Sequence, residues 1–196
     1  ASDPNGKSSA GAVYLYRVEA NQTVTLLQKV IATDGTANDF FGYTVSQAGN
    51  ILAVGAHQAD PEGKSNAGAV YLYRVETNET VTLLQKVIAP DAAISDSFGT
   101  SVSQSGHLLA IGAHQTDTAG KSNTGSVYLY HVEANGTATF LQKVIATDGA
   151  VDDRFGYSVS QSGNLLAVGA YYADPDGKSN AGAAYLYRVE ANGTVT

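Results

Sequence analysis

Apolar residues in this chain occur in short runs separated by turns rich in glycine, asparagine and aspartate, a spacing typical of β-strands. One set of four such runs predicts strands at residues 41–47, 51–56, 68–76 and 80–89. In the third of these strands aliphatic residues alternate with tyrosines, as in Val70-Tyr71-Leu72, so neither face is polar. A strand of this kind needs cover on both faces, which predicts a sheet packed between two others.

The four-strand pattern repeats with a period of 57 residues. The run Ala-Gly-Ala-Val-Tyr-Leu-Tyr-Arg-Val-Glu, or a close variant of it, occurs at residues 10–19, 67–76, 124–133 and 181–190. Residues 11–67 and 68–124 differ at only 18 of 57 positions, so the copies must share one local structure. The 196 residues hold about three and a half copies.

These patterns predict an all-β fold of repeated four-stranded antiparallel blades, arranged like a β-propeller. The expected segments are a partial blade at 1–39, full blades at 40–96 and 97–153, and a partial blade at 154–196. A two-sheet sandwich also buries both faces, but it does not explain so close a repeat. Propellers close with about four to eight blades, so we expect an array that is open or completed by neighbouring chains. The 21 glycines, 12 tyrosines and 15% charged residues argue against a helical bundle.

Three motifs recur in fixed order within each copy. They are Asp-x-Phe-Gly, the run Val-Ser-x-Ser-Gly-Asn-x-Leu-Ala-Val-Gly-Ala, and Gly-Ala-Val-Tyr-Leu-Tyr further on. Together they resemble the FG-GAP repeat, the blade unit of integrin-α-type propellers and of many bacterial surface proteins. The resemblance covers nearly the whole chain and implies non-catalytic propeller blades. The chain departs from the family pattern after Gly-Ala, where the expected proline is replaced by His57, His114 and Tyr171.

The resemblance also implies a calcium loop between the second and third strands of a blade, where some family members carry several acidic side chains. Only Asp174-x-Asp176-Gly approaches that pattern here, because a lysine follows every glycine and the copy at 117–121 lacks the middle carboxylate. Asp174 and Asp176 are therefore the candidate metal ligands, and we expect no cofactor other than calcium at this pair. The alternative is a β-turn with aspartate first, proline second and glycine fourth.

Each copy carries an Asn-x-Thr sequence between its third and fourth strands, which is the acceptor sequence for N-linked glycans. The four asparagines are Asn21, Asn78, Asn135 and Asn192. The middle residue varies through Gln, Glu and Gly while Asn and Thr stay, which favours glycosylation in a secreting host. Turn chemistry is the alternative, because Asn-Gly is typical of tight hairpins. Either interpretation predicts exposed hairpin tips.

His57, His114 and Tyr171 share one phase of the repeat. Side chains at one phase lie on neighbouring blades at the same rim, so these three residues are the candidate rim of a shallow ligand surface. The alternative is that they only border a loop. Nothing near them in the sequence supplies the partners of a catalytic base or the Gly-x-Ser-x-Gly turn of a serine nucleophile.

Two other recurring side chains receive structural interpretations. Tyr14, Tyr16 and their repeats are expected to pack between blades, in preference to forming a platform for sugars. Asp39, Asp96 and Asp153 are expected to accept backbone N–H bonds in the turn before Phe-Gly.

Charge and composition exclude several kinds of partner. The formal net charge is −7 and no basic cluster is present, which argues against nucleic acid. The absence of cysteine excludes thiol catalysis and disulfides. No apolar run approaches the roughly 18 residues of a membrane helix, so no membrane insertion is expected. Gly-Lys-Ser recurs, but it lacks the earlier glycine and the following helix of a phosphate loop.

We therefore predict a secreted, non-enzymatic structural or adhesive repeat protein, located outside the cell or at the cell surface. Its expected partners are copies of itself, with residues 23–32 of one chain pairing with the strand at 182–190 of another to give a filament or ring, and possible glycans. The alternative is a ligand- or glycan-binding propeller module of lectin or integrin type within a longer cell-surface protein.

Overall fold

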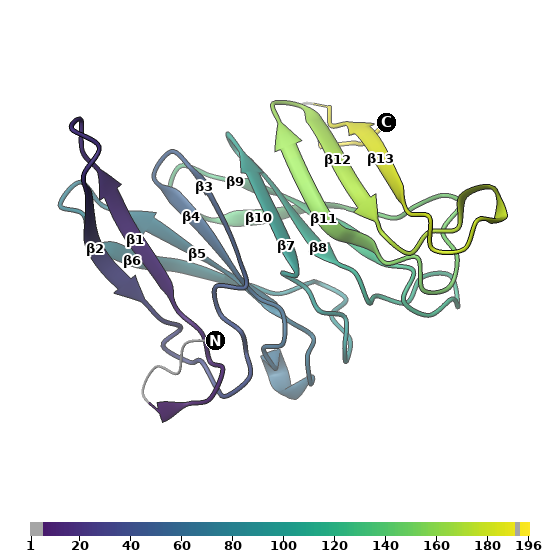
Figure 1. Ribbon diagram of the computed structural model, residues 1–196, viewed down its shortest axis with the longest axis horizontal. Helices are drawn as coiled ribbons and strands as arrows, with labels where there is room; N and C mark the ends of the chain where they lie inside the picture. The colour runs from purple at the N-terminus through teal and green to yellow at the C-terminus, as the bar shows by residue number, and fades with distance from the viewer. Residues whose placement is uncertain (1–5, 191–192) are drawn as a thin grey trace.

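The computed structural model describes residues 6–190 and 193–196, which form four antiparallel β-sheets, here called blades 1 to 4 (Figure 1). Blade 1 contains β1 (Val13–Val18) and β2 (Val24–Val30). Blade 2 contains β3 (Thr44–Ala48), β4 (Ile51–Ala56), β5 (Ala69–Val75) and β6 (Val81–Val87). Blade 3 contains β7 (Ser101–Ser105), β8 (Leu108–Ala113), β9 (Ser126–Val132) and β10 (Ala138–Val144). Blade 4 contains β11 (Phe155–Ser162), β12 (Leu165–Ala170) and β13 (Ala183–Arg188).

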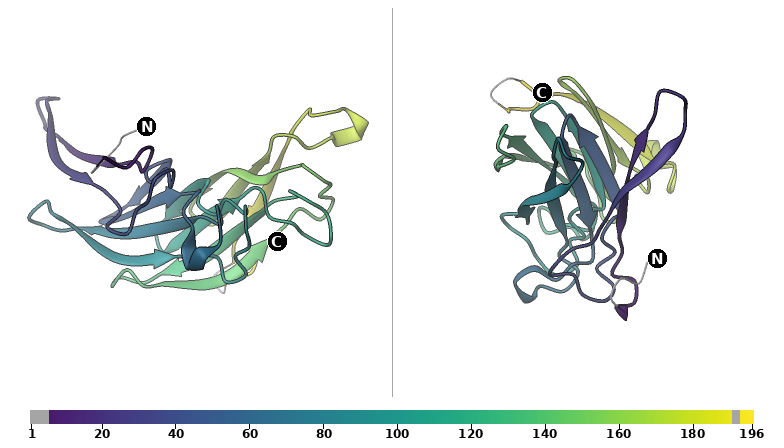
Figure 2. Two further views of the ribbon diagram at one scale, coloured as in Figure 1. Left: turned by 90° about the horizontal axis from the view of Figure 1, so that it is seen from below. Right: turned by 90° about the vertical axis from the view of Figure 1, so that its left-hand side faces the viewer.

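The predicted all-β fold is confirmed. Each full blade runs through its strands in sequence order, β3-β4-β5-β6 and β7-β8-β9-β10, with antiparallel pairing throughout. The blades follow one another along the long axis of the molecule, from the purple N-terminal end to the yellow C-terminal end, and they do not close into a ring (Figure 2). The helical segments that lie wholly within the described residues are short 3-10 turns, η2 (Pro61–Gly63) and η3 (Pro175–Gly177).

Consecutive blades pack through two different faces. The Val70 and Leu72 face of blade 2 lies in one buried cluster with Phe98, Tyr128 and Tyr130 of blade 3. The ring of Phe98 meets the ring of Tyr128 edge-on, with centroids 5.4 Å apart, a favoured aromatic arrangement. The aromatic face of one blade is therefore covered by the aliphatic face of the blade before it.

The predicted burial of the tyrosine pairs holds in the two full blades and fails in blade 1. Tyr71 and Tyr128 are buried, as are their partners two residues further on. Tyr14 and Tyr16 are exposed, because blade 1 is covered only on its opposite face, by blade 2.

The recurring glycines allow backbones of adjacent blades to approach closely. Gly125 has a φ of +85°, and a Cβ atom added to it would lie 2.0 Å from the carbonyl oxygen of Phe155. Gly125 and Phe155 form an isolated parallel bridge, as do the equivalent pairs in the earlier copies. The first strand of blade 2 starts at Thr44 and not at the predicted residue 41, whereas the equivalent strand of blade 4 starts at Phe155; both phenylalanines make such a bridge. Phe-Gly is thus a junction between blades.

Serine hydroxyls join the first strands of neighbouring blades, so that β3, β7 and β11 lie side by side along the inner edge of the array. The hydroxyl of Ser46 accepts the N–H of Gln104 at 2.9 Å, and the hydroxyl of Ser103 accepts the N–H of Gln161 at the same distance. The hydroxyl of Ser101 donates to the carbonyl of Gly156 at 2.8 Å. These serines are structural, and their small size lets the inner strands come close.

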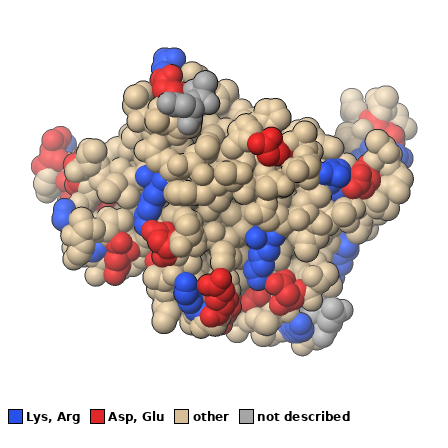
Figure 3. Space-filling model, turned by 180° about the vertical axis from the view of Figure 1, so that it is seen from behind, with Lys and Arg blue, Asp and Glu red and all other residues tan. Residues whose placement is uncertain are grey.

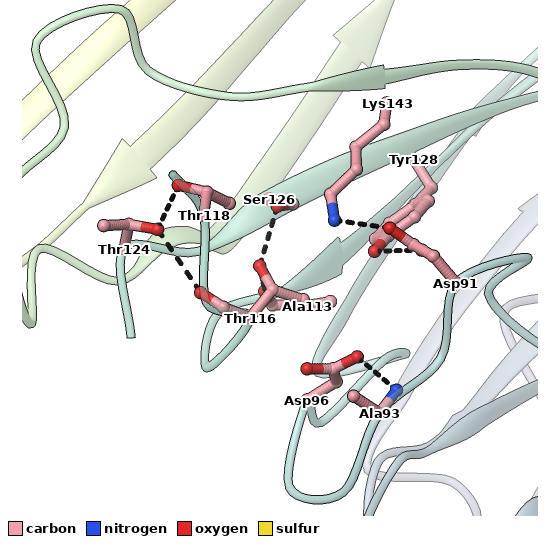
Figure 4. A network of polar contacts seen from close by, with 10 residues as sticks. All are labelled: Asp91, Ala93, Asp96, Ala113, Thr116, Thr118, Thr124, Ser126, Tyr128 and Lys143. Atoms are coloured by element: carbon pink, nitrogen blue, oxygen red, sulfur yellow. Dashed lines mark hydrogen bonds and ion pairs between the residues drawn. The ribbon is translucent and has the colours of Figure 1, made fainter. Parts of the chain in front are cut away.

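A carboxylate in each connection between blades binds to the outer strands of the next blade. Asp91 accepts a hydrogen bond from the Tyr128 hydroxyl at 2.8 Å and forms an ion pair with Lys143 at 2.7 Å (Figure 4). Burial acts to raise the pKa of Asp91, but the bonds from Lys143 and Tyr128 outweigh it and hold the pKa below its usual value. Asp34, Tyr71 and Lys86 repeat this arrangement in blade 2, and we call each trio a linker clip.

The carboxylates before Phe-Gly accept backbone N–H bonds, as predicted. Asp39 accepts the N–H of Thr36 at 2.8 Å, and Asp96 accepts the N–H of Ala93 at 2.7 Å. Asp153 accepts the N–H of Ala150 at 2.7 Å. These carboxylates are turn elements that fix the entry into the inner strand.

Candidate functional site

The three rim candidates lie at the same end of the inner strands and contact aromatic side chains there. His57 follows β4 and lies against Tyr43, with ring centroids 4.1 Å apart. His114 follows β8 and meets the ring of Tyr157 at 5.3 Å, and Tyr171 follows β12 and meets the same ring at 4.2 Å. We call this surface the inner-rim row. Its members are Tyr43, His57, His114, Arg154, Tyr157, Tyr171 and Tyr172.

Side chains of blades 2 and 4 meet across blade 3 in this row. Burial raises the pKa of Tyr43, and the neighbouring Tyr157 hydroxyl raises it further. The equivalent residue of blade 3 is Thr100, which is small and buried. The inner strands converge, and a short side chain in the middle blade lets the two phenols approach.

Arg154 is the cation of the row. Its guanidinium lies 4.9 Å from the ring centre of Tyr172 and 5.8 Å from that of Tyr171, and its Nη1 donates to the Tyr171 hydroxyl at 2.9 Å. None of the ion pairs found among the described residues includes Arg154. The guanidinium is therefore held by neutral aromatic groups and not by a carboxylate.

The two histidines of the row are held neutral. Burial lowers the pKa of His114 to about 4, and its electrostatic interactions with Arg154 and His57 act in the same direction. The Thr100 hydroxyl donates to the carbonyl of Ser97 at 2.7 Å, so its oxygen accepts from Nδ1 of His114 at 3.0 Å. This arrangement assigns the proton to Nδ1 and leaves Nε2 as an acceptor. Burial also lowers the pKa of His57.

A few enclosed polar atoms lack a hydrogen-bond partner. Within the described residues they are His57 Nδ1, Arg154 Nε, Gln104 Oε1, Gln161 Nε2 and Gln161 Oε1. His57 and Arg154 belong to the inner-rim row, whereas Gln104 and Gln161 lie near the opposite ends of β7 and β11. Buried polar groups are normally satisfied, so His57 Nδ1 and Arg154 Nε are the two atoms of the row that a polar ligand or water can satisfy.

The sequence pointed to three members of the row and missed Tyr43, Tyr157, Tyr172 and Arg154. A signal was present in the comparison of the copies. Through blades 2, 3 and 4, one position is Phe40, Ser97 and Arg154. The position three residues further on is Tyr43, Thr100 and Tyr157. A third position changes from glutamine in two copies to Tyr172 in the last. Chemically large differences between close copies converge on one surface.

The described glycosylation candidates lie at exposed hairpin tips. The side-chain oxygens of Asn21, Asn78 and Asn135 accept the N–H of the threonine two residues on, at 3.1, 3.2 and 2.9 Å. Asn192 lies outside the described residues. The geometry leaves each of the three asparagines accessible, and modification itself stays a prediction.

The candidate calcium loop has the geometry of a closed turn. The side chain of Asp174 accepts the N–H of Asn180 at 2.5 Å, and Asp60 and Asp117 make the same contact in their own copies. Asp176 is exposed and adopts a φ of +55° inside η3. Among the described residues no group of three or more acidic or histidine side chains is placed to hold a metal ion. The contacts of Asp174 match the turn interpretation.

Charges of both signs are scattered over the surface. On the face shown in Figure 3, acidic and basic side chains lie next to one another and no basic patch forms. No helix within the described part of the chain is long and apolar enough to cross a membrane.

The geometry defines an open, propeller-like array of antiparallel blades, and two solved structures share this fold. A functionally unknown protein from Desulfotomaculum acetoxidans DSM 771 matches with a TM-score of 0.55 at 16% identity, over 96% of this chain and 50% of that one. The periplasmic gluconolactonase PpgL of Pseudomonas aeruginosa matches with a TM-score of 0.57 at 19% identity, over 93% of this chain and 48% of that one. At such identities the likeness concerns the fold alone.

The sequence places the chain within a particular family. The family described as FG-GAP repeat matches residues 24–73, 81–130 and 139–187, more than half of the chain, and the chain belongs to this family. Each match begins in the last strand of one blade and ends in the third strand of the next. Integrin alpha-6 of Gallus gallus is 28% identical over 169 residues, which cover 80% of this chain and 15% of that relative. The chain thus spans a small part of this relative and about half of each solved structure.

Proposed function

We propose that this chain is a non-catalytic, integrin-type propeller module that acts outside the cell or at its surface and contacts a ligand through the inner-rim row. One observation carries the proposal: three positions at which close copies differ sharply in chemistry, those of Arg154, Tyr157 and Tyr172, meet on a single surface. The relationship to integrin alpha-6 supports the cellular location.

The composition of the row supports recognition over catalysis. It contains four tyrosines, two histidines and one arginine, and no carboxylate or thiol. His114 is buried, and its pKa of about 4 leaves it uncharged near pH 7, where a general base would instead have a pKa close to the working pH. The gluconolactonase shares only the fold with this chain and adds no catalytic residue to the row.

The close copies supply matched substitutions for the test. Tyr43→Thr, Arg154→Ser, Tyr171→His and Tyr172→Gln each introduce the residue that blade 3 carries at the same position. The fold already accommodates these residues, so the combined variant is expected to fold. Arg188→His, which introduces the residue of blade 3 at another exposed position, is the control.

The experiment measures binding of the whole chain to surfaces coated with purified extracellular-matrix glycoproteins. We expect the wild type and Arg188→His to bind and the fourfold variant to lose at least tenfold in affinity. Equal binding by the fourfold variant and the wild type would remove the row from the function.

Glycosylation of the hairpin tips accompanies this proposal. Asn21, Asn78 and Asn135 are accessible, and their side-chain oxygens face the sequon threonine. Intact mass of protein from a secreting eukaryotic host, before and after glycosidase treatment, should differ, and Asn78→Gln should remove one glycan mass. An unchanged mass would leave the motif with turn chemistry alone.

Head-to-tail association of copies is a second candidate function, favoured by two complementary exposed faces. Leu186 of blade 4 is 82% exposed on the face that blade 3 uses to cover blade 4, and Tyr14 and Tyr16 are exposed on the opposite kind of face in blade 1. A second copy offers the matching surface, since inside the chain these faces already pack together.

Sedimentation across a dilution series tests this association. Assemblies larger than 20.3 kDa are expected for the wild type, whereas Leu186→Lys should sediment as a monomer. Val151→Lys changes an equally apolar exposed residue in the connection before β11 and should associate like the wild type. A monomeric wild type at every concentration contradicts the proposal.

A further inference from the structure

We propose that the inner-rim row binds an acidic saccharide, with the sugar ring stacked on the tyrosines and its carboxylate on Arg154. This inference rests on the proposed function and names the ligand class of the same surface. Three features carry it: the partly exposed tyrosines, the guanidinium without an acidic partner, and the two enclosed polar atoms of the row that lack hydrogen bonds.

The tyrosines form a partly exposed aromatic surface. Tyr43 is 51% exposed, Tyr157 is 39% exposed, and Tyr171 and Tyr172 are each 38% exposed. Tyr171 and Tyr172 lie with their ring centroids 4.2 Å apart, next to Tyr157. A pyranose ring has one face of C–H groups and a rim of hydroxyls. A tyrosine matches both, because its ring is apolar and its hydroxyl donates and accepts.

Arg154 supplies the charge complementarity. Its guanidinium is fixed between the Tyr171 hydroxyl and the Tyr172 ring, and a carboxylate is the group that a fixed, planar guanidinium binds best. The neighbouring His114 is neutral near pH 7 and does not compete for the anion. The chain as a whole is acidic, with a net charge of −7, so a local cation is what permits an anionic ligand here.

The enclosed polar atoms favour a hydroxyl-rich ligand. Among the described residues, His57 Nδ1 and Arg154 Nε have no hydrogen-bond partner. Sugar hydroxyls both donate and accept, so one ligand can satisfy groups of either kind, directly or through water.

A protein partner fits the row less well. An ordinary protein interface buries about 800 Å² on each side. The four half-exposed tyrosines offer only about 400 Å² between them, an area suited to one or two sugar rings. The surface therefore points to a saccharide of that size.

The test compares glucuronate with glucose, which differ in the carboxylate at C6. Binding of each to the whole chain is followed by chemical shifts of the tyrosine rings. We expect glucuronate to bind at least tenfold more tightly than glucose. Arg154→Ser should abolish that preference, whereas Tyr172→Gln should weaken both sugars together. Arg188→His, which removes an exposed arginine outside the row, should behave like the wild type.

Each outcome separates this inference from the proposed function. Equal affinity for the two sugars, absence of binding, or a preference that survives Arg154→Ser overturns the acidic saccharide. If the fourfold variant still loses binding to the matrix glycoproteins in that case, the recognition function stands and only the ligand class falls. If removal of glycans from the coated proteins leaves binding unchanged, the saccharide is likewise overturned. Far-ultraviolet circular dichroism establishes that each variant is folded.

Discussion

The interior and terminal blades have nearly the same sequence but differ in what covers them. Tyr71 in blade 2 is 1% exposed, whereas Tyr14 at the same position of blade 1 is 45% exposed. Leu129 in blade 3 is fully buried, whereas Leu186 at the same position of blade 4 is 82% exposed. The repeat therefore specifies the strands, and the adjoining blade determines how much each apolar side chain contributes to stability.

The linker clips show the same difference in polar contacts. In blade 4, Tyr185 donates to Asp148 at 3.0 Å, and within the described residues no lysine joins them. Burial and this bond raise the pKa of Tyr185 to about 12, while the more deeply buried Tyr128 of blade 3 has its pKa raised further. Blade 1 keeps only Lys29 over the ring of Tyr14, at 5.6 Å. Among the described residues a clip is complete only in blades 2 and 3, which follow another blade and contain a fourth strand.

Blade 3 differs from its neighbours in one correlated set of hydroxyls. In the other two copies of this loop the positions are alanine, proline, alanine and alanine, and here they are Thr116, Thr118, Thr124 and Ser126. The Thr116 hydroxyl contacts Ser126 at 2.7 Å, and Thr118 contacts Thr124 (Figure 4). Each of the four hydroxyls has another as its hydrogen-bond partner, so the four polar residues are tolerated together. A single one of them would leave its hydroxyl without that partner.

The largest expected effect distinguishes the two leucines. Leu129→Ala should lower the free energy of unfolding by about 2–5 kcal/mol, because it empties space between blades 3 and 4. Leu186→Ala should change it by less than about 0.5 kcal/mol, because that side chain is already in solvent. Urea denaturation of the two variants under conditions where the chain is monomeric measures the difference.

A similar loss in both variants would mean that blade 4 is covered in solution. Repeating the measurement at several protein concentrations separates that case. A cost of Leu186→Ala that grows with concentration would assign the cover to a second copy.

The sequence was sufficient for the fold because its signals were local and repeated. Alternation in the third strand, the Asx-type turns and the 57-residue period all agree, and β4 begins and ends where the pattern places it. The first strand of blade 2 was placed too early at Phe41, but the equivalent Phe155 does begin β11, so the shared Phe-Gly motif does not fix where the strand starts. The burial of Tyr14 was wrong because a repeat pattern contains no information on which blade lacks a neighbour.

The site was only partly accessible from sequence. His57, His114 and Tyr171 occupy the same position in successive copies of the repeat, which predicted that they lie at one rim. The structure places them there. The contact of Tyr43 with Tyr157 depends on how far the inner strands converge, which no single copy encodes. Arg154 was missed because it replaces Phe40 and Ser97, and its role appears only once Tyr171 and Tyr172 are beside it.

The second expected effect concerns pH and the interior His114. Its pKa is about 4 in the folded chain and about 6.5 when unfolded, so the unfolded state binds the proton first as the pH falls. The stability it contributes is fully present above pH 6.5 and is lost as the pH falls to about 4, at most about 3 kcal/mol. His114→Asn, which keeps an N–H donor for Thr100, should flatten this part of the stability profile.

The comparison is sharpened by the same position in blade 4, where Tyr171 is partly exposed. Tyr171→His adds a histidine in solvent, so the free energy of unfolding between pH 7 and 4 should follow the wild type. A drop as steep as that assigned to His114 would show that position, and not burial, controls the titration.

The third effect compares two glycines of the Gly-Ala motif. A Cβ atom on Gly112 would lie 1.9 Å from the carbonyl oxygen of Gly156 in blade 4, so Gly112→Ala should cost about 1–3 kcal/mol. At Gly169 the nearest atom is the hydroxyl of Ser158 in the same blade, which can rotate away. Thermal unfolding should therefore show a much smaller shift for Gly169→Ala, and equal shifts would contradict backbone contact between blades as the cause.

The smallest effect tests the linker clips. Asp91→Asn keeps an acceptor for Tyr128 but loses the charge that Lys143 faces, and since both side chains are partly exposed we expect a cost of about 1 kcal/mol. Asp148→Asn removes the same charge where the described residues place no lysine, so its cost should be a few tenths of a kcal/mol. Raising the salt concentration should reduce the difference between the two variants in urea denaturation, because exposed ion pairs are screened. Equal costs, or a difference that does not respond to salt, would contradict a charge interaction between Lys143 and Asp91. Lys143 would then contribute by packing on the Tyr128 ring, whose centre lies 5.0 Å from its ammonium.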